Sequence, residues 1–545
     1  MFVDDFRKEF YDNLVGKRVL LMVHHDVDAL CAIRILLHLL EADNIQYSLV
    51  SIRNKEEFVK TFNAHQQSAS NIVLINFGAT FDVYDEIDCS EDKCIYIIDN
   101  HRPVDVHNVY RPEVKLVMRA ETCKNIPLYE DLFRDSDEED EGDERRYSLE
   151  MLEKRKERRV WKERRLRLLF EYTQFSYFGH SVAFQMFELA WKMSKDNFEL
   201  LWLAIIGVCD LRVNDKIDEH MYEESLRSLK SHLTRLTHAQ NSAGNNSIDI
   251  VFDKDLQLVL YRHWSLFESF RHTLLCSSRF KVWNVKGYKR MLEFFAEIGI
   301  PLVQCKQKFF AMDLEFRKNS QQWIDELAEK YSLIGIVSNS FVGSRGFRHR
   351  YNANDIALGV KAILESPNKE KSSGEKFLEA LDSLSPKKIS ILHHGIEAAK
   401  IQYEAIWKQV HATLEMKSIV NAGPFLYVIL HESAPDAKLF SFAGCLLTLA
   451  RFLLHSHVAS SRSRRVANLP LILITPDLCS TEFALAAGIP PVAEQSPNNL
   501  LGKALLQAAQ RLKCPMEPDF YDGCVVRFPV EEKLHLIDAL VSLLS

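Results

Sequence analysis

Short apolar runs that end in acidic, amide or imidazole side chains most strongly limit how this 545-residue chain can fold. One run covers 19–23, a second covers 95–98, and a stretch with a helical pattern, 29–40, follows the first. Runs of this length that alternate with helical patterns are typical of a parallel β-sheet. In such sheets the functional groups gather beyond the carboxyl ends of the strands. The sequence therefore predicts an α/β fold and the edge of the sheet where a site should lie.

Two polar motifs stand at that predicted edge, at 24–28 and at 99–101. Their carboxylates and imidazoles suit a pair of divalent cations, because Mn²⁺ and Mg²⁺ select anionic oxygen ligands. A two-metal site holds its ions about 3.5–4 Å apart and needs several such ligands. A third apolar run, 72–75, ends at Asn76, where a bridging carboxylate would be useful but a neutral amide stands. A further acid, Asp210, follows the apolar run 201–206.

These segments resemble the DHH phosphoesterases, the superfamily of RecJ-like nucleases. The first motif of that superfamily, roughly D-x-D-x-D-G, falls on 24–29, and its D-H-H falls on 99–101. The positions that match the superfamily are Asp26, Asp28, Asp99, His101 and Asp210. The positions that depart from it, where a ligand is lost, are His24, Asn76 and Asn100. The resemblance implies a vestigial metal site.

A closer resemblance, to the family of eukaryotic cell division control protein 45, runs from end to end of the chain. The matching segments are 1–11, 26–31, 74–79, 101–104, 306–309, 311–313, 423–427 and 538–545. The resemblance implies a nuclear factor of replication initiation and elongation, a pseudoenzyme without catalytic residues, metal or other cofactor. It also implies that the protein joins the Mcm hexamer to the GINS complex in the replicative helicase. The resemblance further implies contact with single-stranded DNA and with a replicative polymerase. It implies no association with a membrane.

Two functions of different classes follow from these observations. The first is a non-catalytic scaffold subunit, in which the acids cap helices or hydrogen-bond to one another. The alternative is an active Mn²⁺-dependent nuclease or phosphoesterase. Asn76 and Asn100 favour the scaffold, because losing even outer-shell partners of a metal costs about 10–100-fold in affinity or activity.

A further pair of histidines, His393-His394, lacks a preceding acid and is predicted to be structural.

Composition excludes several other classes of protein. Hydrophobic residues make up 47% and charged residues 26%, as in globular proteins, and the net charge of −7 argues against a surface that coats DNA. The eleven cysteines form no C-x-x-C pair, so zinc ribbons and thioredoxin-like motifs are not expected. No secretory signal is expected at the start of the chain, which leaves reduced thiols in the cytosol or nucleus. The apolar stretch 439–454 contains Arg451 and is predicted to be a buried helix rather than a membrane span.

Composition shifts and the resemblance together divide the chain. The expected parts are 1–125, the first part of a DHH-like α/β domain; 126–167, an acidic loop and charged helix; 168–215, the closing part of the DHH-like domain; 216–365, a helical middle domain; 366–376, a linker; and 377–545, a DHHA1-like α/β domain.

The insert carries two candidate regulatory segments. Residues 135–144 contain eight acids, and Ser136 with the acids after it resembles the site of an acidophilic kinase. The basic cluster that follows is a possible nuclear localisation signal and consists of Lys154, Arg155, Lys156, Arg158 and Arg159. The competing interpretation of the acidic segment is a solvated loop. The competing interpretation of the basic cluster is that it pairs with the neighbouring acids.

The middle domain is predicted to dock proteins, because relatives that only cut DNA do not need it. Its large side chains are either interface anchors or core. They are Phe309, Phe310, Met312, Phe341, Phe347 and Tyr351. The mixed basic and aromatic stretch 343–351 suits single-stranded nucleic acid, a partner groove or an ordinary surface loop.

Overall fold

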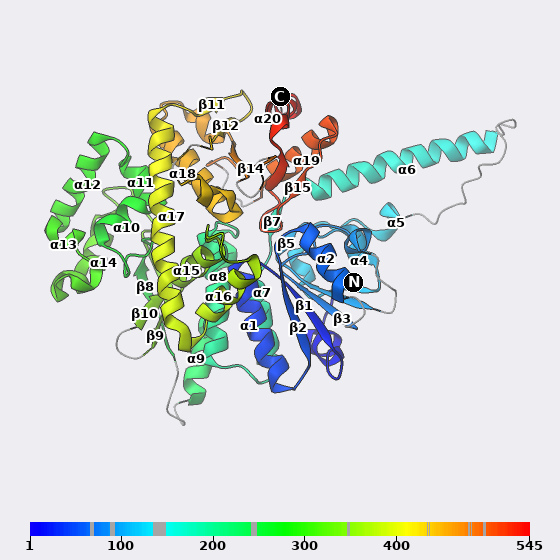
Figure 1. Cartoon of the computed structure of the whole chain (residues 1–545), viewed down its shortest axis with the longest axis horizontal. Coiled ribbons are helices and arrows are strands. Elements are labelled where there is room, and N and C mark those ends of the chain that lie inside the picture. The colour runs from blue at the N-terminus through cyan, green and yellow to red at the C-terminus, as the bar shows by residue number, and fades with distance from the viewer. Residues whose placement is uncertain are drawn as a thin grey trace.

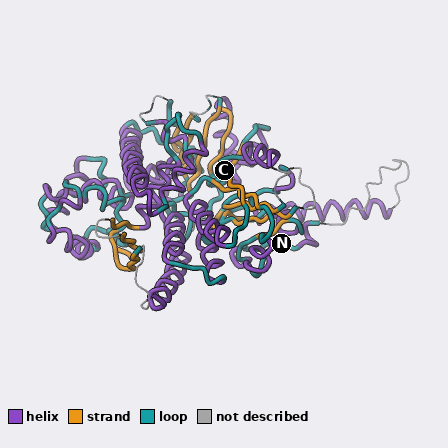
Figure 2. Tube along the Cα trace, turned by 60° about the horizontal axis from the view of Figure 1, so that its bottom comes forward, coloured by secondary structure: helices purple, strands orange, loops and turns teal. Residues whose placement is uncertain are grey.

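A computed structural model describes the chain apart from residues 66–69, 88–92, 134–148, 241–247, 346–348, 433, 435, 478–479, 481, 494–497 and 545. The predicted α/β fold is confirmed, and far more of the chain lies in helices than in strands (Figure 1). Coloured by secondary structure, the trace shows strands in the centre and right of the body, a separate small group of strands at the left, and helices around them (Figure 2).

The first sheet is wholly parallel, as the apolar runs predicted. In sheet order, its strands are β2 (Tyr47–Ile52), β1 (Val19–His24), β3 (Asn71–Ile75), β4 (Cys94–Ile98) and β6 (Val114–Leu116). Side chains alternate across it: Leu21 and Val23 pack into one core, whereas Leu20 and Met22 pack into another on the opposite face. Both faces are therefore covered, which explains why these strands appear as continuous apolar runs.

Helices cover both faces of this sheet. On one face lie α1 (Val27–Ala42), α7 (Val182–Lys192) and α8 (Phe198–Val213); on the other lie α2 (Lys55–His65), α3 (Val83–Glu86) and α4 (Val106–Tyr110). A short antiparallel pair, β5 (His101–Arg102) with β7 (Tyr177–Phe178), links the end of β4 to the chain that follows the insert.

The insert ends in a long helix, α6 (Leu149–Thr173), which projects away from the body (Figure 1). Its base is packed: Leu169 and Tyr172 join a small apolar cluster with Leu132 of α5 (Tyr129–Leu132). The charged helix predicted from the sequence is confirmed.

The middle of the chain contains its own helical lobe. Buried apolar side chains between residues 256 and 336 form a separate core, and this segment is called the helical lobe. The helices of this region are α9 (Glu219–Gln240), α10 (Leu266–His272), α11 (Leu274–Phe280), α12 (Val285–Ile298), α13 (Leu302–Lys306) and α14 (Leu314–Ala328). The sequence predicted a mostly helical region here and did not predict the three-stranded antiparallel sheet that the structure contains. This sheet consists of β8 (Asp249–Leu256), β9 (Val337–Arg345) and β10 (His349–Asn352).

Three helices connect this lobe to the last sheet: α15 (Ala353–Leu364), α16 (Ser373–Ser383) and α17 (Ile389–Glu415). Helix α16 begins inside the predicted linker, because Ser372 and Glu375 form a reciprocal capping box there. The final sheet is mixed, and α18 (Ala443–Ser460) packs on it. In sheet order, its strands are β11 (Val420–Asn421), β12 (Leu426–Ile429), β13 (Leu471–Pro476), β14 (Phe483–Ile489), β16 (Val525–Pro529) and β15 (Glu517–Pro518); the last helices are α19 (Leu501–Leu512) and α20 (Lys533–Leu544).

The apolar stretch 439–454 is largely buried and forms the start of α18 and the turn before it. Within the described residues, no helix combines the length and apolar character needed to cross a membrane.

Candidate functional site

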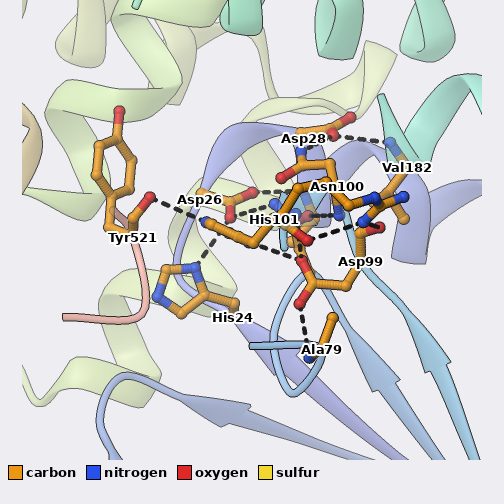
Figure 3. Close-up of polar contacts among 12 residues, drawn as sticks. His24, Asp26, Asp28, Ala79, Asp99, Asn100, His101, Val182 and Tyr521 are labelled. Atoms are coloured by element: carbon orange, nitrogen blue, oxygen red, sulfur yellow. Dashed lines mark hydrogen bonds and ion pairs between the residues drawn. The ribbon is translucent and has the colours of Figure 1, made fainter. Parts of the chain in front are cut away.

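The predicted edge of the first sheet does bring the polar motifs together (Figure 3). β1, β3 and β4 are neighbours in the sheet and run parallel, so the residues that follow them meet at one edge. His24 ends β1, Asn76 follows β3, and Asp99 and Asn100 follow β4. All are buried. Asn76 has a φ of 60°, in the left-handed region that asparagine tolerates better than most residues.

Asp26 is held entirely by hydrogen-bond donors. It is the N-cap of α1, and its Oδ1 accepts from the Ala29 backbone N–H at 2.6 Å. Its Oδ2 accepts from His24 Nδ1 at 2.9 Å and from Asn76 Nδ2 at 2.6 Å. Burial alone raises the pKa of Asp26, but the hydrogen bond from His24 helps to bring it down to about 2. This carboxylate is therefore ionised at neutral pH, and both of its oxygens accept hydrogen bonds.

Asp28 lies in the first turn of α1, and its hydrogen bonds join this helix to the start of α7, which is far away in the sequence. Its oxygens accept from Ser181 Oγ at 2.5 Å and from the backbone N–H groups of Val182 and Ala183, at 2.8 and 3.0 Å. Asn100 Nδ2 adds a fourth bond at 3.0 Å. Burial is the main reason that the pKa of Asp28 rises to about 6, and the Asp26 charge adds to it. A Cβ on Gly207 of α8 would lie 2.5 Å from Asp28 Oδ1, so this approach needs glycine.

Asp99 and His101 form a second pair at the same edge. His101 Nδ1 lies 2.6 Å from Asp99 Oδ1, and Ala79 N–H donates to Asp99 Oδ2 at 3.0 Å. His101 Nε2 donates to the backbone carbonyl of Tyr521 at 3.1 Å. Both ring nitrogens therefore face acceptors, which requires a proton on each. Burial lowers the pKa of His101, but the Asp99 carboxylate more than offsets it and raises that pKa.

Asp210 lies within helix α8 rather than after a strand. Its Oδ1 accepts from Asn214 Nδ2 at 2.9 Å, and Asn214 Oδ1 in turn accepts from Lys361 Nζ at 2.6 Å. Burial raises the pKa of Asp210 to about 7, and the charge of Lys216 acts in the opposite direction. The charges of two buried lysines, Lys216 and Lys361, thus act on Asp210, and the sequence motifs did not reveal them.

Several residues of the site were missed from the sequence. They are Ser181, Asn214, Lys216, Lys361 and Tyr521. A lysine or a tyrosine outside any motif gives no local signal of such a role. Only Ser181 carried a signal, because serine before a helical pattern is a common N-cap, and it caps α7.

A segment of the last sheet closes the site. Residues 519–524, here called the closing loop, connect β15 to β16. The Tyr521 carbonyl accepts from His101 and, at 3.0 Å, from Lys216 Nζ. The Phe520 ring stacks on Phe77 and on Phe81, with ring centroids 5.4 and 5.5 Å apart. Figure 3 shows Tyr521 entering from a segment separate from the sheet that carries His101.

Two clefts border this closed region. One, of about 530 Å³, is lined by residues that include His24, Arg53 and Tyr521. The other, of about 1060 Å³, is lined by residues that include Lys216, Arg451 and Asp522. The closing loop contributes to the walls of both.

The donor set does not suit a pair of divalent cations. The carboxylates of Asp26, Asp28 and Asp99 all accept hydrogen bonds from N–H or O–H groups, which compete with cations for the same lone pairs. The amide nitrogens of Asn76 and Asn100 point at carboxylate oxygens, where a cation would need to be. Among the described residues, no group of three or more His, Cys, Asp or Glu side chains is arranged to hold a metal.

The other predicted positions lie elsewhere. Ser136 falls outside the described residues, as does Phe347. The basic cluster lies on α6, where Lys156, Arg158 and Arg159 are exposed; Lys154 and Arg155 belong to the same helix.

The described large side chains of the middle region are mostly core. Four are buried: Phe309, Met312, Phe341 and Tyr351. Of the two interpretations, core therefore holds for these four, whereas Phe310 is 55% exposed. His393, predicted to be structural, lies on α17, with its Nε2 3.0 Å from the Tyr351 hydroxyl.

Comparisons with known proteins agree across the whole chain. The family model described as CDC45 matches residues 19–133 and 119–542. The cell division control protein 45 homolog of Homo sapiens is 39% identical over 566 residues, which covers 100% of both chains. The homolog of Mus musculus is 40% identical over 567 residues, with the same coverage. A crystal structure of CDC45 from Entamoeba histolytica covers 99% of each chain with a TM-score of 0.73 at 21% identity, which shows a shared fold.

Proposed function

The chain belongs to the CDC45 family of DNA replication factors, and we propose that it serves there as a non-catalytic scaffold that bridges the Mcm hexamer and the GINS complex. One observation carries the non-catalytic part. Asn76 and Asn100 donate hydrogen bonds to Asp26 and Asp28, so neutral amides satisfy the carboxylates that a metal pair would otherwise need. We interpret the cluster as a vestigial metal site in which five positions are kept and His24, Asn76 and Asn100 are changed.

An active Mn²⁺-dependent nuclease is the competing function. It needs open ligand positions and room for a phosphodiester at the sheet edge. The closing loop stands at that edge, with the Tyr521 carbonyl bonded to His101. This arrangement supports the scaffold over the nuclease. It also makes contact with single-stranded DNA at the sheet edge less favourable, because a strand there would have to displace the loop.

The full chain with Mn²⁺ is expected to leave single-stranded DNA intact. Because the carboxylate oxygens already accept hydrogen bonds, Mn²⁺ has no free set of ligands to bind. A nuclease assay should give background cleavage for the native protein and the same background for Asp26→Ala and Asp99→Ala. Cleavage by the native protein that disappears in either variant would establish the nuclease instead.

The helical lobe is the part that we propose for docking. It has its own core and lies at the far end of the molecule from α6 (Figure 1). Its surface exposes several large apolar side chains: Val285, Leu302, Val303, Phe310, Leu314 and Ile334. Lys306, Lys308 and Lys318 are exposed in the same part of the chain. We propose that this surface takes part in binding helicase subunits.

Two adjacent phenylalanines give a matched test of that surface. Phe310 is 55% exposed and Phe309 only 8%. We expect Phe310→Ala to leave the melting temperature nearly unchanged while weakening binding to Mcm and GINS by about 2 kcal/mol or more, if Phe310 is an anchor. Phe309→Ala is expected to lower the free energy of unfolding by about 3–5 kcal/mol, because it leaves a cavity in the core. Normal co-purification of Mcm and GINS with Phe310→Ala would remove Phe310 from the docking surface.

We also propose that the protein acts in the nucleus. The side chains of Lys156, Arg158 and Arg159 on α6 are exposed and therefore accessible to an import receptor. Phosphorylation at Ser136 stays a prediction from the sequence.

A further inference from the structure

Lys216 is an internal cation in an unusual position. It is 2% exposed and follows α8 closely in sequence. Its ammonium group lies 3.8 Å from the centroid of the Tyr521 ring and 4.7 Å from that of Phe178. Lysine is almost never fully buried unless its charge is balanced, so these contacts call for an anionic partner nearby.

The charge of Lys216 acts on carboxylates of the site. Among the charges that act on Asp26 and on Asp210 is that of Lys216, which favours the ionised form of both. A second buried ammonium, Lys361, acts on Asp210 in the same way and reaches it through Asn214. The charges of two lysines thus act on acids whose positions match metal ligands in the sequence motif.

Lys216 also holds the closing loop. The Tyr521 carbonyl accepts from Lys216 Nζ at 3.0 Å and from His101 Nε2 at 3.1 Å, so both of its lone pairs are used. Hydrogen bonds from charged donors are roughly twice as strong as neutral ones. The loop is therefore tied by hydrogen bonds to two side chains from two separate segments of the chain.

We propose that the Lys216 ammonium group replaces a divalent cation as the counter-charge of the buried carboxylates and, through the Tyr521 carbonyl, keeps residues 519–524 closed across the sheet edge. This inference rests on the proposed vestigial state of the site and adds a mechanism to it. The positive charge that such a carboxylate cluster requires comes from the chain itself, and the same group shuts the site. Closure is then independent of metal.

Hydrogen–deuterium exchange on the full chain tests both parts. With Lys216→Met, which keeps the length but not the charge, exchange of peptides covering 519–524 is expected to rise about tenfold, because loss of a charge-assisted bond makes local opening easier. Lys216→Arg keeps a cation and is expected to exchange much more slowly than Lys216→Met. Lys330→Met is the matched control, since Lys330 pairs with Glu297 on the surface of the helical lobe; it is expected to leave 519–524 unchanged.

A double variant tests the counter-charge. If Lys216 balances Asp210, adding Asp210→Asn to Lys216→Met removes both charges, and the melting temperature is expected to recover part of the loss caused by Lys216→Met alone. Strictly additive losses, or unchanged exchange of 519–524 in Lys216→Met, would overturn the proposal.

Two further outcomes are also decisive. If Lys216→Met does not fold, folding of the double variant supports the counter-charge, and failure of both variants overturns it. Nuclease activity of the native protein would defeat the proposed function, whereas the exchange of 519–524 reports closure separately.

Discussion

Asn76→Asp is expected to lower the free energy of unfolding by about 3–5 kcal/mol in the absence of metal, the size of loss seen when a buried charge is left uncompensated. Asn76 Nδ2 lies 2.6 Å from Asp26 Oδ2, and both residues are buried. The substitution replaces a donor by a second carboxylate, which repels Asp26 and loses the hydrogen bond. Aspartate tolerates positive φ nearly as well as asparagine, so the backbone at φ 60° contributes little to the effect.

Chemical denaturation with and without Mn²⁺ measures this effect. We expect Mn²⁺ to raise the denaturant midpoint of Asn76→Asp but not that of the native protein, because a ligand that binds only the folded state stabilises it. Lowering the pH is expected to reduce the deficit, since one proton shared by the two carboxyl groups relieves their repulsion.

Asn44→Asp is the matched control for this substitution. Asn44 also has a positive φ, 54°, but is exposed, so we expect a change within about 0.5 kcal/mol. An Asn76→Asp variant as stable as the native protein without metal would show that the amide does not take the place of a cation.

The location of the site was predictable because it depends on local signals. The strands β1, β3 and β4 are buried on both faces, so each is an uninterrupted apolar run. The polar residue after each run then marks the strand end, and parallel pairing places these ends side by side. The sequence therefore predicts which acids meet without any knowledge of the rest of the chain.

The partners of those acids were not predictable in the same way. His101 and Tyr521 are 420 residues apart, and Lys216 and Tyr521 are 305 apart. Contacts of that kind depend on how the first and last sheets meet, and neither a backbone carbonyl nor a single lysine has a sequence pattern. The closing loop was missed for this reason, although it changes the chemistry of the site more than any single motif position.

The antiparallel sheet in the middle region was missed for a different reason. β8 carries Asp249, Asp253 and Asp255, and its exposed and buried positions do not alternate regularly. Aspartate is depleted in strands, so such a run is weakly marked as β. The contact of the partly buried Phe252 with the buried Phe341 of the neighbouring strand, rather than local propensity, indicates the pairing.

Asp28→Ala is expected to lower the free energy of unfolding by about 3–5 kcal/mol, because it leaves several buried donors without an acceptor. The donors are Ser181 Oγ, the backbone N–H groups of Val182 and Ala183, and Asn100 Nδ2. One effect opposes this loss: burial and the Asp26 charge raise the pKa of Asp28 to about 6, so removing the carboxylate relieves some repulsion. Four unsatisfied donors outweigh that relief, since each buried polar group left unpaired costs about 1–3 kcal/mol.

A second helix-capping aspartate supplies the control. Asp105 caps α4 through the His107 backbone N–H at 2.8 Å and is only partly buried. Water can replace that bond, so Asp105→Ala is expected to cost about 1 kcal/mol. Urea denaturation of the two variants should therefore separate them by about 2 kcal/mol or more, the difference between the two expected losses. Equal losses would mean that Asp28 is an ordinary helix cap, and that the site no longer depends on its acids for stability.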